Sequence, residues 1–324
     1  MIQETKKAKK KQVKQEKTNQ KDEKSEENVK EDTSENIRYG PSVRFRYQRV
    51  WSRFFLIFAV FIAWCNIQQG KEFYLAKQEE ILLTRTLILK CSSNYEAEIS
   101  TYPKCVPQRC GRIVTDKLVS STETDILLKM AVNGLNLAGS DGGASILDLH
   151  SGALSKGQDF IDIYTLPEAK EIFNSVDFAI YKVVKIKIQH IIAYTFGIPP
   201  NEIFLTKPTF FSRMTNVSAK TVHDEYWHPH VDKETYEFFH YTGLLYLNDF
   251  GRDFEGGRFM FVDKNIKTVI EPRKGRVSMF TSGSENLHEV ERVQSGTRYA
   301  LTISFTCDPN AAISDPNYRT KQEK

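Results

Sequence analysis

The sequence predicts an α+β protein in which an antiparallel β-sandwich or barrel is buttressed by helices. After Pro200, short runs such as YTGLLYLND and RYALTISFTC alternate in character and are separated by turn sequences such as GRDFEGG. Before them, apolar residues recur at helical spacing over 124–137 and 176–196. Strands that follow a helical stretch in this way are typical of a sheet core supported by helices.

Length, composition and charge bound the possibilities further. With 324 residues, 40% of them hydrophobic, the chain can form one fairly large domain with appendages. The net charge of +4 is small, and no basic face interleaved with aromatic residues is evident. We therefore expect no nucleic-acid partner. The sequence gives no indication of the oligomeric state.

The amino-terminal segment is predicted to be a disordered tail. Residues 1–49 are dominated by Lys, Glu, Gln, Asn, Ser and Asp, as in KKAKKKQVKQEKTNQKDEKSEE. Such a composition cannot bury enough apolar surface to offset the loss of chain entropy. A solvated tail is the favoured interpretation, and a basic patch that binds phosphate groups is the alternative.

Residues 50–70 are predicted to form a single transmembrane signal anchor. Every residue over 54–65 is apolar, and no charge appears until Lys71. This run can cross a hydrocarbon core of about 30 Å, and a buried core helix is the alternative. Four arginines lie directly before the run, at 44, 46, 49 and 53, so the positive-inside rule predicts a type II orientation. The tail would then be cytoplasmic, and residues 71–324 would lie in the endoplasmic reticulum lumen or elsewhere in the secretory pathway.

Two further features agree with a lumenal location. Asn216 opens the sequence Asn-Val-Ser, an acceptor for glycosylation. An even number of cysteines follows the anchor, which is what paired disulfides require. These candidates are Cys91, Cys105, Cys110 and Cys307. Three connectivities are possible, and buried thiols or a weak zinc site are the alternatives to disulfides.

The lumenal part divides into four predicted segments. Residues 71–120 are expected to form a cysteine-containing stem, and 121–200 a helical support region. The catalytic or binding domain is expected over 201–308, followed by a tail over 309–324. Within the support region, the sequence GSDGGASILDLHSGALSKG is rich in glycine and serine and is predicted to be a connecting loop.

The sequence DEYWHPHVD at 224–232 contains the first candidate metal ligands. In a strand, residues i and i+2 point to the same side, so His230 and Asp232 would converge on one point. His288, in SENLHEVERV, can supply a third ligand. Two histidines and one carboxylate form the arrangement that leaves open positions on a non-haem iron(II), Fe(2+).

Arg298 is the candidate binding residue for an acidic co-substrate. It opens the predicted strand RYALTISF, ten residues after His288, and would share a face with Ala300, Thr302 and Ser304. An arginine inside a barrel is costly unless it meets an anion, and its guanidinium matches a carboxylate with two hydrogen bonds. A metal beside such an arginine suits 2-oxoglutarate, whose 2-oxo acid end would chelate iron, with O2 as the second co-substrate.

These motifs resemble the prolyl-4-hydroxylase-like branch of the 2-oxoglutarate/Fe(II) dioxygenases. The resemblance runs in order through HVD, LLYLND, GGRFMF, LHEVERV and RYALTISF. The likeness to a membrane-bound member of this family is closer still. It includes GSDGGASILDLHSGAL, LTKPTFFSR, HDEYWHPHVDK and FTSGSENLH, and extends over roughly 91–308.

The resemblance implies a double-stranded β-helix, or jelly-roll, core with the histidines and aspartate named above as iron ligands. Arg298 would bind the far carboxylate of 2-oxoglutarate, and L-ascorbate would keep the iron reduced. Tyr246 and Thr302 match positions that hydrogen-bond the same carboxylate, and Val290 matches an apolar wall beside it. Collagen-type prolyl hydroxylases have Lys in place of Arg298, so a collagen-like substrate does not follow from the resemblance.

The resemblance further implies a dioxygenase that hydroxylates a protein or peptide side chain, with proline as one candidate. In this reaction 2-oxoglutarate becomes succinate and CO2. The alternative is a catalytically silent, membrane-tethered binding module on the same fold. His228 lies two residues before His230 and is expected to support the site or face the substrate rather than bind the metal.

Overall fold

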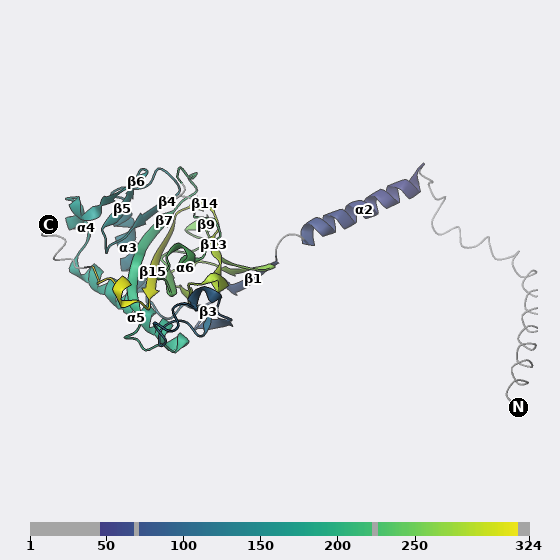
Figure 1. Cartoon of the computed structure of the whole chain (residues 1–324). Helices are drawn as coiled ribbons and strands as arrows, with labels where there is room; N and C mark the ends of the chain where they lie inside the picture. Colours follow the sequence, from purple (N-terminus) through teal and green to yellow (C-terminus); the bar gives the residue numbers. More distant parts are fainter. Residues whose placement is uncertain (1–45, 68–70, 222–225, 317–324) are drawn as a thin grey trace, which may run out of the picture. The chain divides into compact units, whose positions relative to one another are not determined.

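The computed structural model describes residues 46–67, 71–221 and 226–316, which belong to two units, 1–69 and 70–324 (Figure 1). In the first unit the described residues form helix α2 (Gln48–Ile67). Almost all of the tail predicted to be disordered lies outside the described residues. Within the described ranges, no helix combines the length and the apolar character needed to cross a bilayer, so the span predicted over 50–70 is not supported.

Two sheets and a ribbon make up the β-structure of the described residues of the second unit. The larger sheet has the order β2 (Arg85–Leu89), β3 (Cys110–Thr115), β12 (Val277–Thr281), β8 (Tyr241–Tyr246), β15 (Arg298–Thr306), β7 (Phe204–Met214), β4 (Ala144–Leu147), β5 (Ala153–Lys156) and β6 (Asp159–Asp162). The smaller sheet has the order β1 (Lys71–Ala76), β11 (Ile266–Ile270), β10 (Phe259–Asp263) and β13 (His288–Val290). The ribbon pairs β14 (Val293–Gly296) with β9 (Phe254–Gly256). All strand pairs are antiparallel except β1 with β11.

An aromatic core lies between the two sheets. Phe259 and Phe261 of β10 meet Phe280 of β12 in the same buried cluster, with ring centroids 5.7 Å and 5.3 Å from that of Phe280. Leu244 of β8 and Ala300 of β15 belong to this cluster too. Side chains from both sheets thus pack face to face, as the predicted sandwich requires, and the arrangement is consistent with a jelly-roll core.

Helices α3 (Ser121–Leu135) and α5 (Ser175–Phe196) cover the other face of the larger sheet (Figure 1). The described residues of the second unit also form the short helices α4 (Ala169–Ile172) and α6 (Asp232–Thr235), with 3-10 turns at Ser93–Tyr95, Ile163–Thr165, Ser284–Asn286 and Pro309–Ala311. Ser120 and Glu123 form a capping box that starts α3, and Asn174 and Asp177 form one that starts α5. Gly197, in the left-handed conformation, ends α5. The helices predicted over 124–137 and 176–196 are confirmed.

Two segments differ from their predictions. The stretch 71–120 is not a separate stem, because it supplies β1 to the smaller sheet and β2 and β3 to the larger one. The glycine-rich stretch 139–157 is not a plain loop, because it forms the hairpin β4–β5. Leu147 and Leu154 pair across this hairpin and are fully buried, and Gly152 turns the chain with φ +86°. Both segments supply strands that pair with partners distant in sequence: β1 with β11, β3 with β12, and β4 with β7.

Two disulfides join the loop before β3 to the rest of the second unit. Cys91 pairs with Cys110, and Cys105 pairs with Cys307, which follows β15. The predicted disulfides are thus confirmed and the connectivity is chosen among the three possibilities.

We expect the two disulfides to differ in their contribution to stability. The bond Cys105–Cys307 closes a loop with a sequence separation of 202, whereas Cys91–Cys110 closes one of 19. Chain-entropy arguments then assign about 5 kcal/mol to the first and about 3 kcal/mol to the second. Denaturant unfolding of the paired Cys→Ala variants measures both losses. An equal loss, or a larger loss for Cys91 and Cys110, would contradict the assignment.

Candidate metal centre

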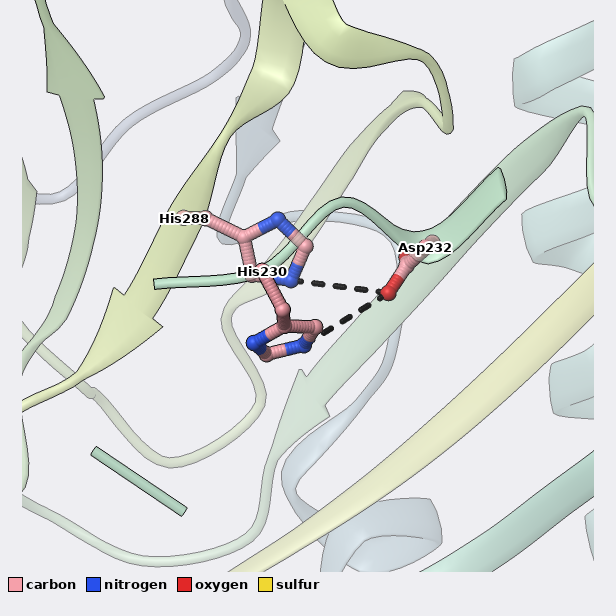
Figure 2. A group of neighbouring side chains, drawn as sticks. All are labelled: His230, Asp232 and His288. Carbon is pink, nitrogen blue, oxygen red and sulfur yellow. Dashed lines mark ion pairs between the residues drawn. The ribbon is translucent and has the colours of Figure 1, made fainter. Parts of the chain in front are cut away.

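Three side chains converge at the open edge of the smaller sheet: His230, Asp232 and His288 (Figure 2). Their candidate ligand atoms all lie within 4.8 Å of one another. Nε2 of His230 is 3.7 Å and Nε2 of His288 is 3.6 Å from Oδ1 of Asp232. His288 is buried at the start of β13, whereas 45% of the His230 side chain is exposed. The cluster is therefore built on a buried strand and remains accessible from one side.

The backbone brings the three side chains together in a way that differs from the predicted strand. His230 forms an isolated antiparallel bridge with His288, through two backbone hydrogen bonds of 2.9 Å and 3.0 Å. Asp232 is not in a strand, since it begins α6. Val231 between them is still extended, with φ −114° and ψ 124°, and is buried. One extended residue is enough to send the flanking side chains to the same side, so the predicted convergence is confirmed.

Backbone carbonyls orient both imidazole rings. Nδ1 of His230 lies 3.1 Å from the carbonyl oxygen of His228, and Nδ1 of His288 lies 2.8 Å from that of Asn286. A carbonyl can only accept, so each Nδ1 donates its proton and each Nε2 presents a lone pair to the cluster. His228 thus supports the site as predicted, through its backbone.

The cluster consists of acceptors that face one another. Burial lowers the pKa of His288, which favours its neutral imidazole. Oδ1 of Asp232 faces both imidazoles, and its Oδ2 accepts a hydrogen bond of 2.6 Å from the hydroxyl of Thr242. The hydroxyl oxygens of Thr242 and Ser282 lie 3.0 Å apart. Two imidazole lone pairs and a carboxylate oxygen directed at one point fit a divalent cation, and the Thr242 bond fixes the carboxylate for it.

Thr242→Val is expected to weaken metal binding by about 10- to 100-fold, because the carboxylate of Asp232 loses the bond that orients it. The measurement is a competitive titration of Co(II) or Fe(II) under anaerobic conditions. Thr268→Val is a matched control, since Thr268 is equally buried and donates a bond of the same 2.6 Å length to Asp263, outside the cluster. Equal losses of metal affinity in the two variants would show a general effect on packing.

Arg298 lies at the start of β15 and is only 1% exposed. Its Nε donates to the carbonyl oxygen of Gly257 at 3.0 Å, and its Nη1 lies 3.4 Å from Sδ of Met214. Its Nη2 has no hydrogen-bond partner among the described residues. Burial lowers the pKa of Arg298, which is the sign of an unfavourable environment for its charge. A buried guanidinium with a free donor requires an anionic ligand.

A cavity of about 280 Å³ extends from Arg298 to the metal cluster. Its walls include Thr302 and Val290. Tyr246 is not among the residues that line the cavity, and its hydroxyl lies 3.3 Å from Ser278 Oγ; its contact with the co-substrate stays a prediction. Its ring lies 5.6 Å from the Arg298 guanidinium and packs beside it. The cavity joins a cation site to an anion site, which suits a ligand with a chelating end and a carboxylate end.

Several residues that shape the site were not identified from the sequence. Gly257 was predicted only as a turn residue, yet its carbonyl binds Arg298, and a Cβ at this position would lie 3.0 Å from Cδ of Arg298. Thr242 and Ser282 carry no signal, since hydroxyl residues are common in strands and their contact with Asp232 depends on the fold. The pair Gly256–Gly257, both with positive φ, was the available sign of a close approach.

Comparisons with known proteins agree with this geometry. The sequence model of the 2OG-Fe(II) oxygenase superfamily matches residues 214–306, which contain the cluster and Arg298. The chain is 53% identical over 246 residues to 2-oxoglutarate and iron-dependent oxygenase domain-containing protein 3 of Xenopus tropicalis, covering 75% of this chain and 77% of that one.

Two further similarities are more limited: one covers a short stretch of the chain, and the other has low sequence identity. A stretch of 77 residues is 48% identical to human Prolyl 3-hydroxylase 2, covering 23% of this chain and 10% of that protein. The solved prolyl hydroxylase of Trichoplax adhaerens, in complex with a hypoxia inducible factor peptide, is 15% identical with a TM-score of 0.42, covering 70% and 89% of the two chains. A TM-score this low supports no conclusion about substrate.

Proposed function

Since the chain belongs to the 2OG-Fe(II) oxygenase superfamily and is a dioxygenase that uses Fe(2+) and 2-oxoglutarate, we propose that it hydroxylates a side chain of a protein or peptide substrate. Two observations support a macromolecular substrate. His230 is substantially exposed, so a polypeptide can reach the metal cluster. The relative with local similarity, Prolyl 3-hydroxylase 2, is named for action on prolyl residues, which makes proline the first candidate target.

The geometry supports the residue roles in this proposal. His230, Asp232 and His288 would hold the iron, through two Nε2 atoms and one carboxylate oxygen. Arg298 would bind the far carboxylate of 2-oxoglutarate through its free Nη2. When bound, the iron would activate O2: one oxygen atom would enter succinate as 2-oxoglutarate loses CO2, and the other would hydroxylate the substrate, with ascorbate as the reductant typical of the family.

The protein contributes position and the exclusion of water. Backbone carbonyls hold the two imidazoles in one tautomer, and Thr242 holds the carboxylate of Asp232. Val290 and the aromatic core keep the wall beside the co-substrate apolar. An acid bound in this cavity would be fixed at both ends, so its reactive carbons would be held near the metal position.

The unpaired Nη2 of Arg298, on a cavity shared with the cluster, is the observation that carries the proposal. A catalytically silent binding module would have no need to keep a buried, partly unpaired cation there. The test is succinate formation from 2-oxoglutarate by the Fe(II)-loaded protein with ascorbate, joined to a search for +16 Da modifications in secreted proteins. Iron-dependent binding of 2-oxoglutarate with no succinate under any substrate condition would favour the silent module.

We propose a lumenal location for residues 71–324. The two disulfides support an oxidising compartment, and the sequon residue Asn216 is exposed at the end of β7. The proposal does not depend on helix α2. It predicts that endoglycosidase treatment of the protein from secretory cells shifts its electrophoretic mobility, and that Asn216→Gln removes this shift. Absence of the shift in the unsubstituted protein would count against lumenal exposure of this segment.

A further inference from the structure

A second unpaired polar atom borders the cavity. Among the described residues, three buried side-chain atoms have no hydrogen-bond partner: Arg298 Nη2, Ser304 Oγ and Asp315 Oδ1. Asp315 is compensated by an ion pair with Lys185 at 2.9 Å. The free Nη2 of Arg298 is explained if it binds the far carboxylate of 2-oxoglutarate. Ser304 is fully buried and lines the same cavity, so its hydroxyl also requires a hydrogen-bond partner. Binding of the co-substrate's far carboxylate by Arg298 does not supply that partner.

The strand register places Ser304 at the opposite end of the cavity from Arg298. On β15, Ser304 is paired with Thr242 of β8, the residue that donates to the carboxylate of Asp232. Arg298 is six residues earlier, at the first position of β15. The metal cluster lies at the level of Ser304, and the co-substrate would extend from there toward Arg298. Ser304 therefore borders the part of the cavity that this arrangement leaves for a second molecule.

The walls around Ser304 are mostly apolar. Four further lining residues belong to this end, which we call the far chamber: Pro208, Thr235, Tyr236 and Phe239. Thr235, Tyr236 and Phe239 come before β8, which begins at Tyr241. They therefore lie beyond the start of this strand, whereas Arg298 lies near its other end, at Tyr246. The rings of Tyr236 and Phe239 stack with centroids 4.8 Å apart. Among the described lining residues, the far chamber adds no charged side chain to the metal cluster.

We propose that Ser304 is a specificity-determining residue that contacts the substrate. Its hydroxyl donates to the backbone carbonyl of the target residue, and its small size leaves the far chamber open to that residue's side chain. The chemistry fits an uncharged, apolar side chain in an extended peptide. A prolyl residue suits it well, because proline brings an acceptor carbonyl, an apolar ring for the aromatic wall and no backbone N–H to leave unpaired.

A charged target side chain does not suit the far chamber. A lysine or aspartate placed there would lose its hydration, and the described walls offer it no ion-pair partner besides the metal ligands. The far chamber thus discriminates by excluding charge, and Ser304 discriminates by hydrogen bonding and by size. This assignment rests on the proposed function, since it assumes that a polypeptide approaches the metal cluster.

The test separates peptide binding from co-substrate binding. The probes are fluorescein-labelled peptides with a central proline, lysine or aspartate in an otherwise identical extended sequence. They are titrated into protein loaded with Zn(II) and 2-oxoglutarate, so that binding is measured without turnover. We expect the proline peptide to bind most tightly and Ser304→Ala to weaken it about 3- to 10-fold, the effect of one neutral hydrogen bond.

A bulkier variant and a matched control complete the experiment. Ser304→Leu would fill the far chamber, and we expect it to abolish detectable binding of the proline peptide while the dissociation constant of 2-oxoglutarate changes far less. Ser212→Ala is the control, because Ser212 also lines the cavity but its hydroxyl already donates to the carbonyl of Ala300 at 3.4 Å. It should leave peptide binding unchanged.

Three results would overturn the proposal. The first is that Ser304→Ala weakens 2-oxoglutarate binding as much as peptide binding, which would assign the hydroxyl to the co-substrate. The second is that the lysine or aspartate peptide binds as well as the proline peptide, or that none of the three binds. The third is that Ser304→Leu binds the proline peptide normally. Succinate formation is measured separately, so loss of the proposed oxygenase activity would not be confused with any of these results.

Discussion

Asp232→Ala is expected to reduce 2-oxoglutarate-dependent succinate formation by more than about 100-fold. Residues that merely support a metal ligand contribute about 10- to 100-fold, and Asp232 is the only carboxylate in the described cluster. Its removal leaves two neutral imidazoles, which provide no charge to balance the cation. The measurement is succinate formation at saturating 2-oxoglutarate, together with iron content after anaerobic purification.

Glu234→Ala is the matched control for this variant. Glu234 is an exposed carboxylate two residues further along α6, and no described contact links it to the cluster. We expect it to keep the iron content and the succinate rate of the unsubstituted protein. A similar loss in both variants would indicate damage to α6, and normal activity of Asp232→Ala would remove Asp232 from the metal site.

Arg298→Met is expected to weaken 2-oxoglutarate binding by about two orders of magnitude or more. Removing one partner of a buried, hydrogen-bonded charge pair costs about 3–5 kcal/mol, and each 1.4 kcal/mol corresponds to a factor of ten in the dissociation constant. The variant should also lose discrimination. The unsubstituted protein should prefer 2-oxoglutarate over 2-oxovalerate, which has the same chain length but no far carboxylate, and Arg298→Met should bind both acids with similar affinity.

The same variant should not destabilise the protein without ligand. Arg298 is buried with a free Nη2, so its charge opposes folding until an anion arrives. Methionine of similar length should leave the unfolding free energy unchanged or raise it, as denaturant unfolding can measure. Arg298→Lys keeps the charge but loses the forked geometry, so its affinity for 2-oxoglutarate should be intermediate. A strongly destabilised Arg298→Met with normal 2-oxoglutarate binding would make Arg298 structural.

The sequence predicts correctly those elements whose signals lie within a few consecutive residues. Helices α3 and α5 have apolar residues at helical spacing and begin at capping residues, Ser120 and Asn174. The strands after Pro200 show alternation and turn residues. The His-x-Asp spacing was informative because one extended residue, Val231, is all that the convergence requires. These features depend on neighbours in the chain, and sequence patterns record such neighbours well.

Features that depend on distant pairing were not predictable in the same way. Strand β1 pairs in parallel with β11, from the far end of the unit, so no turn sequence marks the pairing. The hairpin β4–β5 joins the larger sheet because β4 pairs with β7, which follows it in the chain. The hydroxyl of Tyr246 lies 3.3 Å from Ser278 on the adjacent strand β12, a contact that no local pattern in the sequence indicates. In each case the deciding contact is set by the tertiary fold.

The most direct test of the metal and anion sites together is a calorimetric titration of 2-oxoglutarate under anaerobic conditions, with and without Fe(II). If His230, Asp232 and His288 hold the metal and Arg298 holds the far carboxylate, tight binding will require Fe(II). It will then be lost in Asp232→Ala and in Arg298→Met. Binding of 2-oxoglutarate that is equally tight without metal, or that survives both substitutions, would contradict the assignment of one shared site.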